Sequence, residues 1–136
     1  MENCIFCKIA KGEISCVKIW EDKNYLAFLD IAPAIEGMTL VIPKKHFDSR
    51  IFEMSDREYL DLTLAAKKVA EILKKGSNAE RILMVAEGLD VSHSHIKLYP
   101  YLKNGSGLGL KAYPKKTDEE LQKVADKIKA NTKVFK

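Results

Sequence analysis

The chain has 136 residues, 46% of them hydrophobic, and three cysteines. This length and composition provide one hydrophobic core, which excludes a disordered chain and a small disulfide-stapled one. The formal net charge is +4, but residues 111–136 hold eight lysines against four acids, so residues 1–110 are neutral. A neutral body argues against a broad nucleic-acid footprint, and the lysines are most simply the solvated face of a basic C-terminal helix and tail.

The chain opens with no positively charged leader before an apolar core, and no apolar run is long enough to cross a bilayer. We therefore expect a cytoplasmic protein without membrane contact. A reducing compartment and an odd cysteine count both argue against a disulfide framework.

The N-terminal part predicts a short helix followed by extended segments. Residues 5–11 are apolar with helical spacing and are closed by Gly12. Residues 16–20 and 25–29 flank a turn-rich stretch and predict a hairpin, and residues 39–42 predict a third strand.

A central helix is indicated most strongly. Ser55 and Glu58 form a capping box, and Lys74-Lys75-Gly76 makes a basic last turn with a glycine stop. The apolar positions between them step by three and four, at Tyr59, Leu62, Ala66, Val69 and Leu73.

The remaining segments alternate strand, loop and helix signals. Residues 81–86 predict a strand that residues 87–90 connect tightly to an extended run at 92–100. The glycine-rich residues 104–109 predict a loop. A second capping box, Thr117 with Glu120, begins a C-terminal helix whose apolar stripe is Leu121, Val124, Ala125 and Ile128. Strands in runs with segregated helices predict an α+β fold with a mainly antiparallel sheet, in a single domain over residues 1–136.

The most informative run is Ser92 to Pro100. If it is a strand, its alternation puts His93, His95 and Lys97 on one face. Two imidazoles spaced by two suggest a metal ligand, an acid/base group or a nucleophile, although a plain surface strand is an alternative.

The N-terminal pair Cys4 and Cys7 forms a C-x-x-C motif. A redox role would need a strand before the motif, but only three residues precede it, so zinc is the better interpretation. Zinc takes four tetrahedral ligands, and the chain offers only His46, His93 and His95 to complete the set. A lone histidine at position 46 would otherwise be a surface residue.

Several runs together resemble the N-terminal half of the histidine triad (HIT) superfamily. The resemblance extends from about Cys4 to Pro100 and is carried by Cys4-Ile5-Phe6-Cys7-Lys8-Ile9, Gly12-Glu13-Ile14, Trp20-Glu21-Asp22, Leu26-Ala27-Phe28-Leu29-Asp30-Ile31-x-Pro33 and Gly37-x-x-Leu40-Val41-Ile42-Pro43-Lys44-x-His46. It implies a five-stranded antiparallel sheet with two main helices, usually dimerised into a ten-stranded sheet, so we expect a homodimer.

The resemblance also implies a chemistry. The family motif is His-x-His-x-His, and its positions fall on His93, His95 and Lys97. By that analogy His95 attacks the α-phosphorus of a nucleoside phosphoramidate, a nucleotide ester or a dinucleoside polyphosphate, and Lys97 compensates phosphate charge. Asp30 matches the acid that binds the ribose hydroxyls. Four residues match the apolar walls of the nucleoside pocket, although each would also suit an ordinary core: Phe6, Ile9, Leu29 and Ile31.

In zinc-containing members of the family, the residues that match Cys4, Cys7, His46 and His93 hold a structural zinc ion. All four are present in this chain.

The departures from the family pattern fall in the catalytic half. Lys97 replaces the third histidine, and Met38 replaces a histidine that is usual after Gly37. Residues 86–92 are shorter than the family's loop and contain no counterpart of its asparagine and serine. A zinc-stapled nucleotide-binding or interaction module with weakened or lost catalysis is therefore the alternative to an enzyme, and nucleic-acid binding through the tail is a distant third.

Overall fold

The structure is a computed structural model that describes residues 3–102 and 114–132. By its internal contacts the chain divides into two units, Met1–Gly105 and Ser106–Lys136. The single domain over residues 1–136 stays a prediction.

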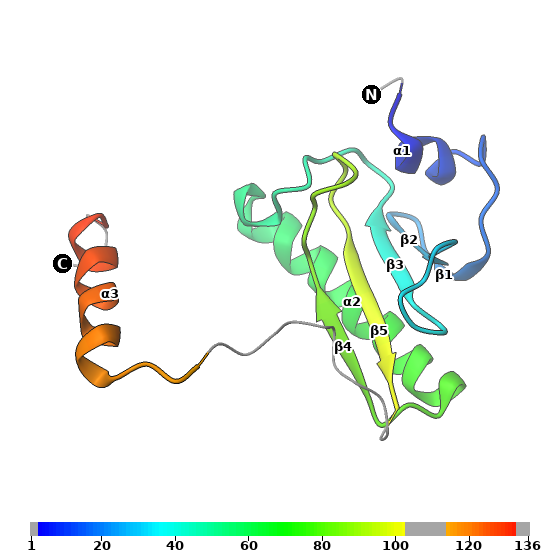
Figure 1. Cartoon of the computed structure of the whole chain (residues 1–136). Helices are drawn as coiled ribbons and strands as arrows, with labels where there is room; N and C mark the ends of the chain where they lie inside the picture. Colours follow the sequence, from blue (N-terminus) through cyan, green and yellow to red (C-terminus); the bar gives the residue numbers. More distant parts are fainter. Residues whose placement is uncertain (1–2, 103–113, 133–136) are drawn as a thin grey trace. The chain divides into compact units, whose positions relative to one another are not determined.

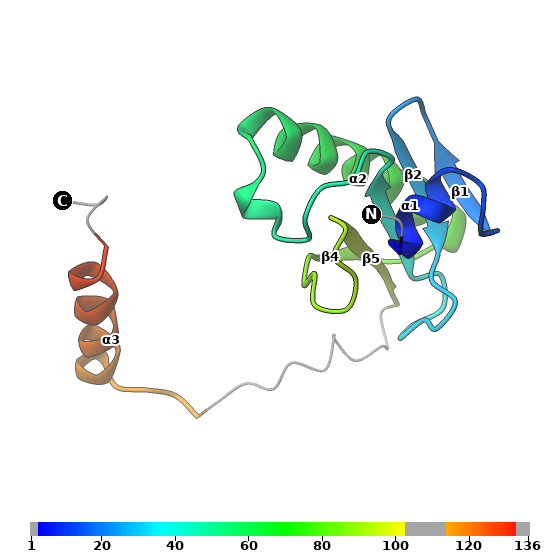
Figure 2. The same cartoon turned by 90° about the horizontal axis from the view of Figure 1, so that it is seen from above.

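The first unit is built on a five-stranded antiparallel sheet, as predicted (Figures 1 and 2). The strand order is β1-β2-β3-β5-β4, which leaves β1 and β4 as the two edges. The strands are β1 (Lys18–Glu21), β2 (Tyr25–Leu29), β3 (Thr39–Pro43), β4 (Arg81–Val85) and β5 (Ile96–Tyr101).

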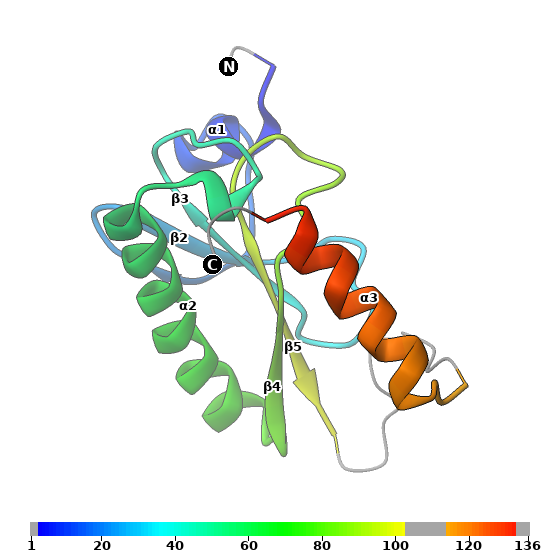
Figure 3. The ribbon, with the colours of Figure 1, turned by 90° about the vertical axis from the view of Figure 1, so that its left-hand side faces the viewer.

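The two faces of the sheet pack against different helices. Helix α2 (Asp56–Ser77) covers one face (Figure 3), where its buried residues meet Ala27, Val41 and Ile96. The opposite face packs against Phe6 of α1 (Ile5–Ala10), with Leu26, Phe28, Leu40 and Ile42 beneath it. Because strand side chains alternate between faces, these two sets interleave along the same strands. Lys97 pairs with Leu40 and therefore lies on the α1 face.

The start of α2 confirms the sequence prediction and its end corrects it. Ser55 accepts a hydrogen bond from the Glu58 amide at 3.2 Å, and the Glu58 carboxylate accepts one from the Ser55 amide at 3.1 Å. The predicted stop at Gly76 is wrong, because Gly76 lies inside the helix. The chain leaves the helix at Asn78, whose φ of 58° is the left-handed conformation that asparagine tolerates.

Three other expectations need correction. The first strand begins at Lys18, two residues later than predicted. A 3₁₀ turn, η1 (Ile51–Glu53), was not predicted. The connection between β4 and β5 is not a tight turn over residues 87–90, because it takes in residues 86–95, including both histidines of the predicted strand.

The second unit contains α3 (Asp118–Ala130), which confirms the predicted C-terminal helix. Thr117 caps it by accepting a hydrogen bond from the Glu120 amide at 3.1 Å. Its apolar stripe is exposed, with Leu121, Val124 and Ile128 each more than half accessible. The predicted loop at 104–109 lies outside the described residues. Within the described ranges, no helix is long and apolar enough to cross a membrane.

Candidate functional site

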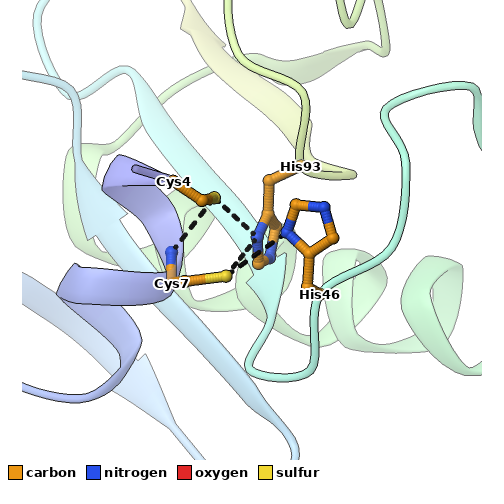
Figure 4. Close-up of side chains that lie close together, drawn as sticks. All are labelled: Cys4, Cys7, His46 and His93. Carbon is orange, nitrogen blue, oxygen red and sulfur yellow. Dashed lines mark hydrogen bonds between the residues drawn. The ribbon is translucent and has the colours of Figure 1, made fainter. Parts of the chain in front are cut away.

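Four side chains from three distant segments meet at one end of the sheet (Figure 4). Cys4 is the N-cap of α1, and its sulfur accepts a hydrogen bond from the Cys7 amide at 3.4 Å, so this short helix presents both sulfurs together. His46 follows β3, and His93 lies in the loop before β5. The structure thus gathers all four residues that the sequence proposed as metal ligands.

The donor atoms of these residues are close enough to share one ion. The ligand atoms, one sulfur from each cysteine and one ring nitrogen from each histidine, all lie within 4.8 Å of one another. The Nδ1 of His93 is 3.4 Å from Cys4 Sγ and 3.5 Å from Cys7 Sγ, and the Nδ1 of His46 is 3.3 Å from Cys7 Sγ. This cluster could hold a metal ion.

The outer nitrogen of the His93 ring fixes its orientation. Its Nε2 lies 2.8 Å from the Pro43 carbonyl oxygen, which can only accept a hydrogen bond. Nε2 therefore carries the proton, and Nδ1 keeps its lone pair for the cysteine side. Complete burial lowers the pKa of His93, which favours the neutral, ligating form of the ring.

The histidine pair does not lie on a strand, which corrects the predicted alternation. Residues 93–95 precede β5, which begins at Ile96. The Nδ1 of His95 lies 2.7 Å from the carbonyl oxygen of His93 and must donate to it. In the neutral ring the lone pair of His95 is therefore on Nε2, and Phe6 packs edge-on against the ring with centroids 5.2 Å apart.

A cavity of about 260 Å³ lies beside His95, on the α1 face of the sheet. Every residue that the sequence proposed for catalysis or nucleotide binding lines it: Phe6, Ile9, Leu29, Asp30, Ile31, His95 and Lys97. Ile31 is 99% exposed, so it contributes only at the rim. Asp30 is held in place by accepting a hydrogen bond from the Ala32 amide at 2.9 Å.

The sequence alone missed other lining residues. Asp90 and Val91 come from the loop before His93, and Ser15 and Cys16 come from the segment before β1. Cys16, which the sequence placed in the first strand, precedes β1 and is partly exposed. Burial is still enough to raise the pKa of its thiol, which keeps it protonated. Further apolar lining comes from Ile5, Ile14, Phe28 and Leu40.

Lys97 has a partner that the sequence did not indicate. Its Nζ lies 3.0 Å from Oε1 of Glu87, and the lysine side chain is 16% exposed against 47% for the glutamate. The hydrogen bond to Glu87 raises the pKa of Lys97, so the ammonium stays charged. Lys97 is therefore a charged side chain held by an ion pair with Glu87.

Met38, at the other departure from the family pattern, belongs to the core. It is 4% exposed, and its sulfur accepts a hydrogen bond from the Ala34 amide at 3.4 Å. It therefore helps to fold the loop before β3.

Comparisons with known proteins agree with this architecture. The HIT domain family model matches residues 11–100. Adenosine 5'-monophosphoramidase hnt1 of Schizosaccharomyces pombe is 38% identical over 136 residues, covering 96% of this chain and 99% of that protein. An uncharacterized HIT-like protein of Methanocaldococcus jannaschii is 44% identical over 101 residues, covering 71% and 78%. The crystal structure of a HIT family member from Bacillus subtilis superposes with a TM-score of 0.77 at 32% identity, covering 96% of this chain and 97% of that one.

Proposed function

The chain belongs to the HIT domain family, and from this premise we propose that it is a nucleotide hydrolase or nucleotidyl transferase acting through His95. Its relatives from three fungi carry the name adenosine 5'-monophosphoramidase, which supports a nucleoside phosphoramidate as substrate. Nucleotide esters and dinucleoside polyphosphates are the other candidates.

The observation that carries the proposal is the hydrogen bond from His95 to the His93 carbonyl. It leaves an unprotonated Nε2 on a side chain that lines the cavity. In the proposed reaction this nitrogen forms a bond to the α-phosphorus, and the phosphorus–nitrogen bond of the substrate breaks to release an amine, which takes a proton from solvent. Water then attacks the nucleotidyl-imidazole, which regenerates His95 and releases the nucleoside monophosphate.

The cavity suits a nucleoside in its chemistry. In the proposed complex the Asp30 carboxylate accepts hydrogen bonds from the ribose hydroxyls, while Phe6, Ile9 and Leu29 contact the base. Lys97 compensates the negative charge of the phosphate as a point charge. Phe6 and Ile9 also pack with the core cluster beneath α1, so ligand binding is the measurement that separates the two roles.

We further propose that the cysteine–histidine cluster holds zinc. With metal–sulfur bonds of about 2.3 Å and metal–nitrogen bonds of about 2.0 Å, adjacent tetrahedral ligands are about 3.5 Å apart. The sulfur–nitrogen distances of 3.3–3.5 Å match that spacing. Four protein ligands leave no open position, so the ion would join α1 to the His93 loop and would not take part in the reaction.

Assembly is a separate proposal, namely a homodimer formed through α2 and the edge strand β4. Helix α2 exposes Leu60 by more than half, and β4 exposes Met84 by 61%. An edge strand beside exposed apolar residues is a surface that association would protect. A cytoplasmic location stays a prediction.

The rival function is nucleotide binding without turnover. It is supported by Lys97, which is paired with Glu87 and stands in place of the third histidine. It is also supported by residues 86–92, which contain no counterpart of the family's asparagine and serine. Incubation with adenosine phosphoramidate, an adenylyl ester and a dinucleoside polyphosphate separates the two. Release of nucleotide by the parent and its loss in His95→Ala supports the enzyme. Tight binding of adenosine monophosphate without release supports the binding module.

A further inference from the structure

The charges around the cavity are unusual for a site that accepts phosphate. Within the described residues, the charged side chains that line it are Asp30, Asp90 and Lys97. Lys97 is thus the single lining cation in that part of the chain, and two acids line the same cavity. A polyphosphate chain adds at least one negative charge with each phosphate and needs matching cations.

Lys97 already forms an ion pair with a third acid, Glu87. Glu87 approaches Lys97 to 3.0 Å from the loop that follows β4, so the pair together carries no net charge. The lysine side chain is 16% exposed and the glutamate side chain 47%, so solvent and salt screen this pairing in part.

The fold fixes Glu87 in this position. Val85 pairs with Lys97 across β4 and β5, which brings the end of β4 beside the lysine. Gly88, the residue after Glu87, has φ of 67°, and its carbonyl accepts a hydrogen bond from Ser49 Oγ at 2.7 Å. A Cβ on Gly88 would lie 2.6 Å from the Ser49 carbonyl oxygen, so the loop has little room to shift. Glu87 is therefore held at the lysine by the backbone on both sides.

We propose that Glu87 is a specificity-determining residue that limits how much negative charge the site accepts. By holding Lys97, it disfavours substrates with a polyphosphate chain and favours those with a single phosphate joined to an uncharged or cationic leaving group, such as an amine. This inference rests on the proposed function, because it assumes that the phosphate binds beside His95 and Lys97.

The test is calorimetric titration of adenosine, adenosine monophosphate and adenosine triphosphate, without added magnesium, into the parent and Glu87→Gln. Removing one negative charge near the phosphates should tighten triphosphate binding about tenfold and monophosphate binding about threefold. Adenosine affinity should not change, which also shows that the cavity is intact. Raising the salt concentration should shrink the gain.

Two further variants serve as controls. Glu87→Asp keeps the charge and should discriminate as the parent does. Glu21→Gln removes an acid that is paired with Lys18 and Lys44 at 3.1 Å each, outside the cavity, and should change none of the three affinities.

The outcomes separate the two proposals. If the parent and Glu87→Gln bind adenosine and both nucleotides with equal affinity, or if the variant binds the triphosphate more weakly, the inference about Glu87 is overturned while the nucleotide site stands. If the parent binds neither adenosine nor its monophosphate, the proposed function is overturned and this inference with it.

Discussion

His93 connects the candidate metal centre to the candidate nucleophile, His95, through two different parts of one residue. Its ring Nδ1 faces the sulfurs of Cys4 and Cys7, while its backbone carbonyl accepts the hydrogen bond from His95 Nδ1 at 2.7 Å. The geometry of the cluster therefore sets the position of the carbonyl that fixes the His95 tautomer. Loss of a metal ion should disturb both stability and activity.

The first prediction concerns that ion. Protein purified without added metal should contain about one zinc per chain, because four protein ligands form a closed structural site. Removal with a chelator should lower both the melting temperature and the rate of nucleotide release, and adding zinc back should restore both. Elemental analysis and thermal unfolding provide the measurements. A metal-free protein of unchanged melting temperature would refute the assignment.

The second prediction concerns the loop that carries Glu87. Gly88→Ala should lower the free energy of unfolding by about 2–5 kcal/mol, since the new Cβ is strained by the positive φ and overlaps Ser49. Gly12→Ala is the matched control. Its φ of 80° carries the same strain, but its Cβ meets nothing within 4 Å, so the cost should be about 1–2 kcal/mol. Urea denaturation measures both, and equal costs would contradict the close packing of this loop.

The sequence predicted what depends on local pattern. Apolar spacing and the Ser55 capping box located α2, and hydrophobic runs located four of the five strands to within two residues. The fifth, β5, begins at Ile96, four residues after its predicted start. The prediction failed where long-range packing decides. Helix α2 continues through Gly76, the predicted stop, and ends at Asn78, which adopts the left-handed conformation. The pairing of Glu87 with Lys97 depends on the register between β4 and β5.

The candidate site likewise contains residues that the sequence identified and residues that only the fold brings together. Residue types restricted the expected metal ligands to Cys4, Cys7 and the three histidines, and the resemblance to the HIT superfamily then selected His46 and His93. The strand face proposed for His93 and His95 was wrong because alternation alone does not show where pairing with β3 begins. Asp90 and Cys16 carried no motif, and only the folded loops bring them to the cavity.

The third prediction concerns Lys97. Lys97→Ala should weaken binding of adenosine monophosphate about tenfold or more, because a charge-assisted hydrogen bond is worth roughly 1.5–3 kcal/mol. Binding of adenosine should be almost unchanged, because it carries no phosphate. Calorimetric titration of both ligands gives the two affinities. Equal affinity of parent and variant for the nucleotide would remove Lys97 from the site.

The fourth prediction concerns assembly. Light scattering of the parent should give the mass of a dimer, and Met84→Glu should shift it toward a monomer by placing a charge on β4, in the proposed interface. Val17→Glu is the control, because Val17 is 65% exposed beside β1, at the opposite edge of the sheet. A parent that is monomeric at micromolar concentration would exclude the proposed dimer.

The central claim is that His95 becomes covalently nucleotidylated, and trapping that intermediate tests it most directly. The parent is mixed with adenosine phosphoramidate and denatured at alkaline pH, because phosphorus–nitrogen bonds to imidazole are labile in acid. Mass spectrometry should then find one adenylyl group per chain, on the peptide that contains His95, and none in a His95→Ala variant that retains its metal. Release of adenosine monophosphate at the same rate by parent and variant, without an adduct on either, would contradict the account.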